Sequence, residues 1–170
     1  MERLDLYDIN RNPLNRTIIR GAKLQKGEYF SCVALWVVTK DRKLFITKRS
    51  PKKSAFPNKW ENTAGAIQAG EHSLDACQRE LFEETGINAS KDDFIKVDET
   101  VSKKQSCIED IYLIVWDVKL EDIIYQKGET TDSKLVSKAE FVDMINKGIV
   151  AEPVINRFYE MEHLLDEYID

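Results

Sequence analysis

Residues 65–87 read GAIQAGEHSLDACQRELFEETGI, a glycine-bearing segment followed by one with a regular apolar pattern. The second segment predicts a helix, because Ser73 is a suitable N-cap and Asp75 puts a negative charge in the first turn, where the helix dipole favours it. Apolar residues follow at helical spacing, at Leu74, Cys77, Leu81 and Phe82. Gly86 stands where a left-handed residue commonly ends a helix. We therefore expect a loop and then a helix over this stretch.

The other side of the expected helix carries carboxylates that repel one another. Glu80, Glu83 and Glu84 fall at i, i+3 and i+4, so they share one face within about 6 Å along the helix axis. They also lie at the negative end of the helix dipole, and Arg79 offsets only part of this charge. Local inconsistency of this kind is expected where function requires it. Carboxylates that converge on one point suit a hard divalent cation such as Mg²⁺, and the alternative is a solvated acidic face.

The complete stretch resembles the signature of the Nudix hydrolase family. That signature is a glycine, five residues, a glutamate, seven residues, and then Arg-Glu, an apolar residue, any residue, Glu-Glu, any residue, a glycine and an apolar residue. Its fixed positions are filled here by Gly65, Glu71, Arg79, Glu80, Leu81, Glu83, Glu84, Gly86 and Ile87. The probability of a chance match is well below about one in 100,000. The resemblance implies an α/β (α+β) fold over residues 1–170, a single Nudix-type α/β/α sandwich with a mixed β-sheet and a loop-helix-loop metal site.

The resemblance also implies a role for each polar residue of the signature. Nudix hydrolases use divalent metal to hydrolyse a diphosphate linked to some other group, so Mg²⁺ or Mn²⁺ is the expected cofactor. The implied metal ligands are the carboxylates of Glu80, Glu83 and Glu84 and the carbonyl of Gly65. Arg79 would orient a glutamate, and Glu71 would brace the loop or bind the metal through water. Within this stretch, the expected catalytic residues are therefore the three glutamates of the helix and Arg79.

A general base is expected outside the signature, because Nudix hydrolases often carry it on a variable loop. The candidates are Glu109, Asp110 and Glu129, and the sequence does not choose among them. Glu129 lies in a polar segment, residues 125–133, where we expect a loop. We count it among the expected catalytic residues. The alternative for each of the three is a surface carboxylate.

Residues 49–59 read RSPKKSAFPNK, which is a loop by composition. It combines cations with aromatic residues, a combination that suits a charged, flat ligand such as a nucleotide. Arg49, Lys53 and Trp60 are therefore the expected substrate-binding residues, with Trp60 supporting the wall of the site rather than stacking on the ligand. The alternative is a solvated basic loop with Trp60 packed into the core.

Residues 4–90 resemble one branch of the family, which contains isopentenyl-diphosphate isomerase and related hydrolases. The shared motifs are Leu6-Tyr7-Asp8, Arg20-Gly21, Gly27-Glu28-Tyr29, Lys48-Arg49-Ser50, Pro57-Asn58-Lys59-Trp60-Glu61 and Ala64-Gly65. The isomerase has a catalytic cysteine where this chain has Thr63-Ala64, and a histidine where it has Phe30. We therefore expect hydrolysis of a nucleoside diphosphate-type substrate, a nucleotide or nucleotide derivative, by attack of water at phosphorus. The alternatives are an isopentenyl-diphosphate isomerase-like enzyme and a catalytically silent module that senses a nucleotide.

Composition and charge set the class of protein. A chain of 170 residues with 42% apolar and 32% charged residues suits one soluble domain with a substantial core. Its net charge of −5 argues against nucleic-acid binding, so the expected partner is a small-molecule diphosphate, and a homodimer is compatible with the sequence. The charged N-terminus predicts no signal peptide, and no apolar run approaches the ~20 residues that a membrane span needs. The three cysteines, Cys32, Cys77 and Cys107, predict free thiols in a reducing cytoplasm, the expected location.

Hydrophobic patterns outside the signature predict the remaining elements. Strands are expected over residues 4–9, 17–19, 32–38, 44–48, 94–101 and 108–118. The first two form a hairpin, and the third is apolar enough to be buried on both faces. Ser137 opens a capping box that starts a helix, and Lys147-Gly148 ends it. Pro153 opens the last helix, whose apolar stripe from Val154 to Tyr168 suits the core better than a partner-binding surface.

Overall fold

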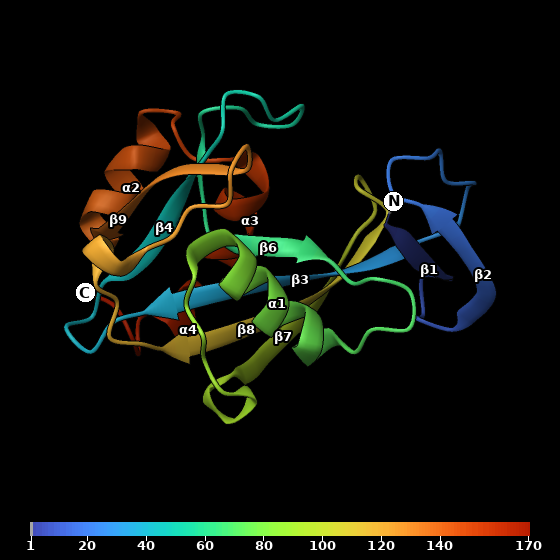
Figure 1. Ribbon diagram of the computed structural model, residues 1–170, viewed down its shortest axis with the longest axis horizontal. Helices are drawn as coiled ribbons and strands as arrows, with labels where there is room; N and C mark the ends of the chain where they lie inside the picture. The colour runs from blue at the N-terminus through green and yellow to red at the C-terminus, as the bar shows by residue number, and fades with distance from the viewer. Residues whose placement is uncertain (1) are drawn as a thin grey trace.

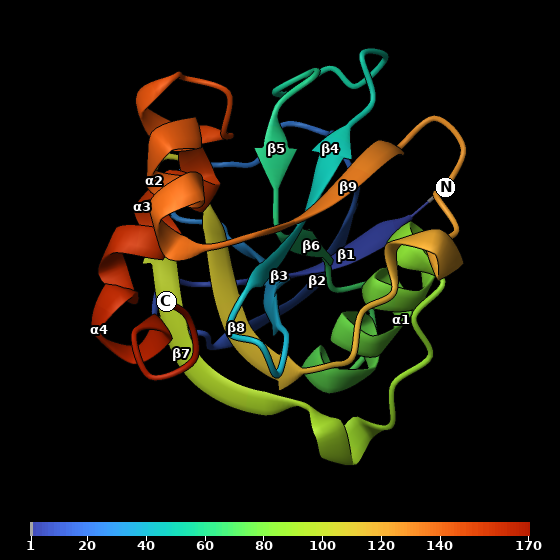
Figure 2. The same cartoon turned by 90° about the vertical axis from the view of Figure 1, so that its left-hand side faces the viewer.

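The computed structural model describes residues 2–170, which fold as an α/β/α sandwich around one mixed β-sheet. Helix α1 (Ser73–Thr85) covers one face of the sheet. Helices α2 (Lys138–Asn146), α3 (Glu152–Glu160) and α4 (Glu162–Leu165) cover the other face, and Figure 2 shows the sheet between the two groups. The fold class expected from the sequence is confirmed.

The sheet has seven strands, and the parallel pairing of β3 with β8 makes it mixed. Its central order is β5-β4-β3-β8-β7, while β6 pairs with β3 and β9 pairs with β4. The pairings other than that of β3 with β8 are antiparallel. The strands are β3 (Phe30–Val38), β4 (Leu44–Arg49), β5 (Trp60–Glu61), β6 (Thr63–Ala66), β7 (Ile95–Ser102), β8 (Cys107–Val115) and β9 (Thr130–Val136).

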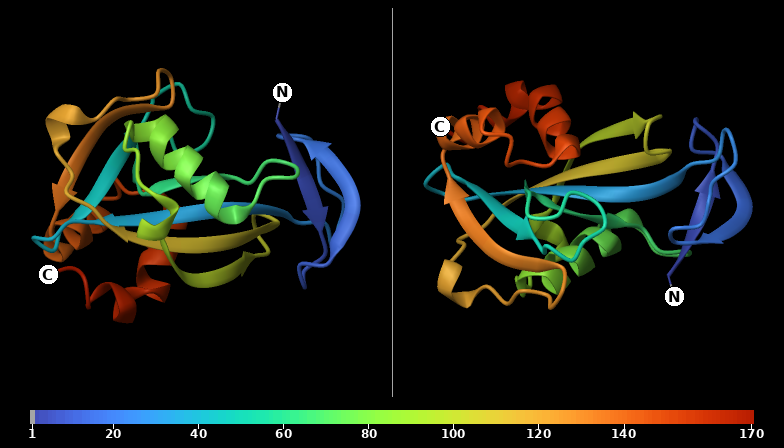
Figure 3. Two further views of the ribbon diagram at one scale, coloured as in Figure 1. Left: turned by 60° about the horizontal axis from the view of Figure 1, so that its bottom comes forward. Right: turned by 90° about the horizontal axis from the view of Figure 1, so that it is seen from above.

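Two further strands, β1 (Arg3–Tyr7) and β2 (Pro13–Ile19), form an antiparallel hairpin at one end of the molecule (Figure 1), as the sequence predicted. The backbone of Tyr7 exchanges hydrogen bonds of 2.8 and 2.9 Å with that of Tyr29, just before β3. The loop between β6 and α1 also reaches the hairpin (Figure 3), where the Ala69 amide donates to the Arg3 carbonyl at 2.8 Å. The hairpin is therefore held against both the main sheet and the loop that precedes α1.

Strand β3 contributes to the hydrophobic core on both faces of the sheet. Its side chains alternate, so Val33, Leu35 and Val37 pack on the α1 side while Trp36 and Val38 pack against α2, α3 and α4. A strand that is apolar on both faces can lie only inside a sandwich. The expectation that this strand is buried on both faces is confirmed.

The start of α1 differs from the sequence prediction. Ser73 is the first residue of the helix rather than its N-cap, and its hydroxyl oxygen lies 3.0 Å from that of Tyr112 on β8. The N-cap position belongs to His72, whose side chain makes no capping hydrogen bond. The end of the helix is as predicted, because Gly86 adopts a left-handed φ of 76° and its amide donates to the Phe82 carbonyl at 2.8 Å.

Phe82, which was expected on the buried side of α1, is 55% exposed. The cause is the position of two glutamates that the sequence placed on the opposite side. Glu80 and Glu84 face inward, and Phe82 lies two positions from each of them, about 200° around the helix. Cys77 and Leu81 are buried, as predicted.

Strand pairing corrects several expected boundaries. β8 ends at Val115 rather than at residue 118. β9 begins at Thr130, inside the segment where a polar loop to residue 133 was expected, because a strand that pairs only with β4 at the sheet edge tolerates a polar face. The short strands β5 and β6 were not expected from the sequence. The last helix is broken at Met161 into α3 and α4, although its apolar residues do pack in the core, as expected.

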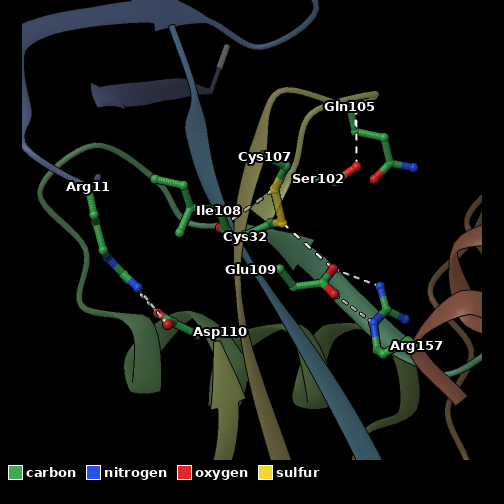
Figure 4. The surroundings of a disulfide bond; sticks show 9 residues. All are labelled: Arg11, Cys32, Ser102, Gln105, Cys107, Ile108, Glu109, Asp110 and Arg157. Atoms are coloured by element: carbon green, nitrogen blue, oxygen red, sulfur yellow. Dashed lines mark hydrogen bonds and ion pairs between the residues drawn. A yellow bond between two sulfur atoms is a disulfide. The ribbon is translucent and has the colours of Figure 1, made fainter. Parts of the chain in front are cut away.

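The structure corrects the expectation of three free thiols. Cys32 on β3 and Cys107 on β8 form a disulfide (Figure 4), and their Cα atoms are 6.6 Å apart. This pair could not be predicted, because 75 positions separate the two residues and it is the parallel pairing of β3 with β8 that brings them together. Cys77 is a free thiol, and burial raises its pKa.

Membrane-spanning helices were not expected from the sequence. Across residues 2–170, no helix is both long and apolar enough to cross a membrane.

Candidate active site

The three glutamates of α1 lie at different depths. Glu80 and Glu84 are each only 8% exposed, whereas the side chain of Glu83 is 41% exposed. The sequence placed all three on one face of the helix, and the structure turns most of that face toward β6. Two of the carboxylates are therefore desolvated and one reaches the surface.

Arg79 fixes the loop before α1 to the helix. Its Nε and Nη2 atoms donate to the two oxygens of Glu71 at 2.8 and 2.9 Å, and Nη2 also donates to the Ala66 carbonyl at 3.1 Å. Its Nη1 atom donates to Glu80 at 2.7 Å and reaches Glu83 at 3.4 Å. Arg79 thus contacts both Glu80 on the helix and Glu71 in the loop before it.

Gly65 lies where β6 passes closest to α1. A Cβ atom built on Gly65 would lie 2.0 Å from Cδ and 2.5 Å from Cγ of Glu80. No side chain can occupy that space while Glu80 keeps its position. The glycine of the signature is therefore required for the close approach of β6 to a buried carboxylate.

Replacing Gly65 with alanine is expected to displace Glu80, destabilise the fold by about 1–3 kcal/mol through overpacking, and lower turnover. Thermal melts and initial rates measure the two effects. The matched control is the same replacement in a Glu80→Ala background, where the added methyl group has room. An equal loss of stability in both backgrounds would contradict the clash with Glu80.

The carboxylate of Glu84 is buried and incompletely paired. Among residues 2–170, its Oε2 atom has no hydrogen-bond partner, and the hydroxyl of Thr63 on β6 has none either. Burial, and after it the charges of Glu61 and Glu80, raises the pKa of Glu84 well above its ordinary value. A buried carboxylate in this state is costly unless it is protonated or paired with a cation.

The donor set fits a hard divalent cation. It consists of oxygen atoms from the three glutamates of α1 and from Gly65, which are the donors that Mg²⁺ and Mn²⁺ prefer. As the side chains stand in residues 2–170, no three of the His, Cys, Asp and Glu residues are grouped closely enough to hold a metal ion. Arg79 instead holds Glu80. Binding of a cation therefore requires side chains of the site to rotate.

A cavity of about 480 Å³ lies between the N-terminal hairpin and the main sheet. Glu61 and Gly65 form part of its wall, and Gly65 also packs against Glu80 of α1. Its other polar walls come from Arg20, Arg49, Glu109 and Arg157, and its apolar walls include Ile18, Phe30 and Phe56. Its volume lies in the range of ordinary small-molecule sites.

The expected substrate-binding residues of the basic loop occupy three different places. Arg49 lines the cavity, donating to Glu61 at 2.6 Å and to the Ala55 carbonyl at 3.0 Å. Lys53 forms an ion pair with Glu129 and does not line the cavity. The loop is therefore tied by ion pairs to two other segments and is not the solvated connector that was its alternative.

Trp60 lies in the hydrophobic core and is 4% exposed. The ammonium group of Lys134 lies 4.9 Å from the centre of its ring. Trp60 is not part of the cavity wall, so the structure corrects its place among the substrate-binding residues. The reason is strand alternation, which turns Trp60 toward α2 and α3 and its neighbour Glu61 toward the cavity.

The adjacent base candidates Glu109 and Asp110 point to opposite sides of β8 (Figure 4). Glu109 faces the cavity and accepts two hydrogen bonds of 2.7 Å from the buried Arg157. Asp110 accepts two from Arg11, at 2.7 and 2.6 Å, and its Oδ1 lies 2.6 Å from the ammonium of Lys96. Burial raises the pKa of Asp110, but the hydrogen bonds from Arg11 and Lys96 outweigh it and hold the pKa well below the usual range. Asp110 is thus committed to ion pairs outside the cavity.

Glu61 is a buried carboxylate in the site that sequence reasoning missed. It is 9% exposed, and burial raises its pKa although Arg49 opposes the shift. In the sequence, Glu61 stands at the end of the Pro57–Glu61 motif, between an apolar residue, Trp60, and a polar one, Asn62, four positions before Gly65. The direction of the Glu61 side chain can be inferred only once β5 and β6 are known to be strands.

A known class of enzyme combines these features, namely the sandwich fold, a glycine packed against a buried glutamate and an arginine paired with the glutamates around it. The sequence profile of the NUDIX domain matches residues 29–158. The chain therefore belongs to the Nudix family, as a Nudix hydrolase, which is a pyrophosphohydrolase.

Individual relatives agree with this assignment. The chain is 33% identical over 153 residues, 87% of each sequence, to a Nudix hydrolase of Listeria monocytogenes. The crystal structure of DR0079 from Deinococcus radiodurans superposes with a TM-score of 0.75 at 22% identity, covering 98% of this chain and 99% of that one. A bifunctional NMN adenylyltransferase/ADP-ribose pyrophosphatase of Francisella tularensis, complexed with AMP and a manganese ion, gives a TM-score of 0.62 at 20% identity, covering 85% of this chain and 43% of that one.

Proposed function

We propose that this protein hydrolyses a diphosphate linkage in a nucleoside diphosphate-type substrate, with Mg²⁺ or Mn²⁺ as cofactor and with water attacking phosphorus. The observation that carries the proposal is the buried carboxylate of Glu84, whose Oε2 atom has no hydrogen-bond partner within residues 2–170. On the neighbouring strand β6, Gly65 packs against Glu80 and also lines a cavity of about 480 Å³. This arrangement places an excess of negative charge near a space that can hold the organic part of a substrate. The Francisella tularensis relative, which carries a manganese ion and AMP, supports the choice of cofactor and substrate class.

Glu83 and Glu84 are the main proposed ligands of the cation, with Glu80 and the Gly65 carbonyl beside them. When bound, such a cation neutralises phosphate charge and makes water a stronger nucleophile at neutral pH. Arg79 holds Glu80 at 2.7 Å and limits how that carboxylate can turn. The protein contributes mainly by positioning the reacting groups, because phosphoryl transfer leaves little covalent chemistry to side chains.

Glu129 is the proposed general base. Its side chain is 41% exposed and pairs only with Lys53, so its carboxylate can rotate toward a water molecule. Its carbonyl accepts a hydrogen bond of 2.7 Å from the Ser50 amide, which holds the residue next to the basic loop. Glu109 is the second candidate, since it faces the cavity but is held by Arg157 through two hydrogen bonds.

The cavity is the proposed binding site for the group attached to the diphosphate. Phe30 and Phe56 supply aromatic walls, and Arg20 and Arg49 supply cations. Aromatic rings and guanidinium groups suit the base and the phosphates of a nucleotide. The hairpin that carries Arg20 therefore helps to choose the substrate.

Arg49→Ala is expected to raise KM about tenfold at saturating Mg²⁺ while lowering kcat less, because a cation in the cavity wall binds ground and transition states alike. Lys53→Ala is expected to raise KM as well, but by less, since Lys53 acts through Glu129. Lys52→Ala, in the same loop and exposed, is the control. Unchanged KM and kcat in the first two variants would leave the loop without a role in recognition.

A panel of diphosphate compounds tests the proposed function. It should contain nucleoside di- and triphosphates, nucleotide sugars and isopentenyl diphosphate, with Glu84→Gln as a control for contaminating activity. We expect release of phosphate or a nucleoside monophosphate that depends on Mg²⁺, with oxygen-18 from labelled water in the phosphate product. Absence of metal-dependent release on every compound would favour a nucleotide-sensing module.

The comparisons support the Nudix family and not the branch of isopentenyl-diphosphate isomerase that the sequence motifs suggested. The isomerase needs a group that protonates the carbon skeleton, and Thr63 and Ala64 occupy the place of its cysteine. We therefore expect no isomerisation. Dimethylallyl diphosphate among the products of the panel would overturn this expectation.

A further inference from the structure

Side chains between Trp60 and Gly65 alternate between the two faces of the sheet. Trp60 packs in the core with α2, α3 and α4, and the Oδ1 atom of Asn62 accepts a hydrogen bond of 2.6 Å from Arg157 on α3. Gly65 lies against α1, and both Glu61 and Gly65 line the cavity. Glu61 lies between Trp60 and Asn62, which both face the helices on the other side of the sheet, and successive residues of extended chain point in opposite directions. The Glu61 carboxylate therefore faces the α1 side.

Glu61 and Glu84 are two buried carboxylates. They are 9% and 8% exposed. Of the charges near Glu84, that of Glu61 contributes most to raising its pKa, ahead of that of Glu80. The Oε2 atom of Glu84 is buried and has no partner, whereas Glu61 is held by Arg49 at 2.6 Å. Two desolvated carboxylates repel unless a proton or a cation lies between them.

We propose that Glu61 is a further ligand of the divalent cation, binding it from β5 opposite Glu84 on α1. This inference rests on the proposed function, because both place the cation at the same site. The cation would then lie between a strand and a helix rather than on the surface of the helix alone. Arg49, released from Glu61 when the cation binds, would turn to the phosphates of the substrate in the same cavity.

Mn²⁺ binding to the substrate-free protein, followed by the electron paramagnetic resonance signal of free Mn²⁺, tests the proposal without any turnover. Glu61→Gln is expected to weaken binding about tenfold or more, as is Glu84→Gln. The matched control is Glu28→Gln, which removes another buried glutamate paired with an arginine, Arg16 at 2.9 Å, outside the site. It should bind Mn²⁺ like the unmodified protein, and a thermal melt of each variant establishes that it is folded.

The two substitutions separate the failure of this inference from that of the proposed function. If Glu84→Gln weakens Mn²⁺ binding and Glu61→Gln does not, Glu61 is no ligand and the proposed function stands. If neither weakens it, the cation does not bind at this site and both proposals fail. Glu61→Asp distinguishes a ligand from a nearby charge, since it keeps the charge and shortens the reach. Direct binding predicts weaker affinity for this variant, and affinity equal to that of the unmodified protein would overturn the proposal.

Arg49→Met provides a test that keeps every carboxylate. Because Arg49 pairs with Glu61 in the absence of metal, its removal should strengthen Mn²⁺ binding several-fold in a chain with Glu61 and much less in Glu61→Gln. An equal gain in both backgrounds would mean that Arg49 opposes the cation through its charge alone, which contradicts competition for Glu61.

Discussion

Glu84→Gln is expected to lower kcat about 100-fold or more, because loss of one cation ligand removes several kcal/mol of transition-state stabilisation. The same change is expected to stabilise the metal-free fold by about 1 kcal/mol, or about 2–4 °C in melting temperature, because a neutral amide replaces an incompletely paired buried carboxylate. Steady-state rates and thermal melts in chelator measure the two effects. A loss of activity together with a clear fall in melting temperature would mean that Glu84 is structural.

Glu83→Gln is the matched control for the gain in stability. It removes the same charge one position earlier on α1, but the side chain of Glu83 is 41% exposed and lies within reach of Arg79 at 3.4 Å. Turnover should fall, as expected for a cation ligand, while the melting temperature changes little. A gain in stability as large as that of Glu84→Gln would show that the helix dipole, and not burial, is the source of the strain.

The gain from Glu84→Gln should depend on pH in a defined direction. Burial and the charge of Glu61 raise the pKa of Glu84 in the folded protein above its ordinary value of 4.5. The folded state therefore holds this proton more tightly than the unfolded state, and the resulting stabilisation is fully present below about pH 4.5 and lost as the pH rises through the folded pKa. The difference in melting temperature between variant and unmodified protein, both free of metal, should grow as the pH is raised above 4.5. A constant difference would contradict the raised pKa.

Removal of divalent cations is expected to abolish measurable hydrolysis, and addition of Mg²⁺ or Mn²⁺ should restore it. The physical reason is that the proposed ligands are oxygen atoms on a helix and a strand and include no imidazole or thiolate. Such a set of ligands selects hard cations over Zn²⁺. Rates measured after exhaustive chelation, and again with each cation in excess, are the test. Chelator presaturated with Ca²⁺ controls for effects of the chelator itself, and activity that survives exhaustive chelation would sink the proposed mechanism.

Binding of Mn²⁺ should also raise the melting temperature, through the same glutamates of α1 that are proposed to bind the cation. A ligand that binds only the folded state raises the melting temperature in proportion to the logarithm of its concentration. We therefore expect Mn²⁺ to stabilise the unmodified protein more than either Glu84→Gln or Glu83→Gln. This readout is independent of the substrate.

The sequence alone determined the family and the general form of the fold. Period-two and period-3.6 patterns are local, so they were enough for the N-terminal hairpin, the buried β3 strand and the helix that ends at Gly86. The signature from Gly65 to Ile87 is also a local pattern, and it identified the glutamates of α1 together with Arg79. Each of these predictions required only the spacing of residues along one segment.

The tertiary structure decided which of those glutamates are desolvated. All three shared one helix face in the sequence, and the approach of β6 buried Glu80 and Glu84 while leaving Glu83 near the surface. It also placed Trp60 in the core and Glu61 in the cavity, because the face of a strand residue depends on where pairing begins. No periodicity could be read in strands as short as β5 and β6.

The disulfide and the ion pairs of the site were beyond the reach of the sequence for a related reason. Cys32 and Cys107 meet because two strands 75 positions apart run parallel, and Asp110 is paired with the distant Arg11. Contacts between distant segments depend on strand order and register, which are set by the packing of the whole sheet. Local patterns thus specified what the elements are, and the sheet specified which charges face each other.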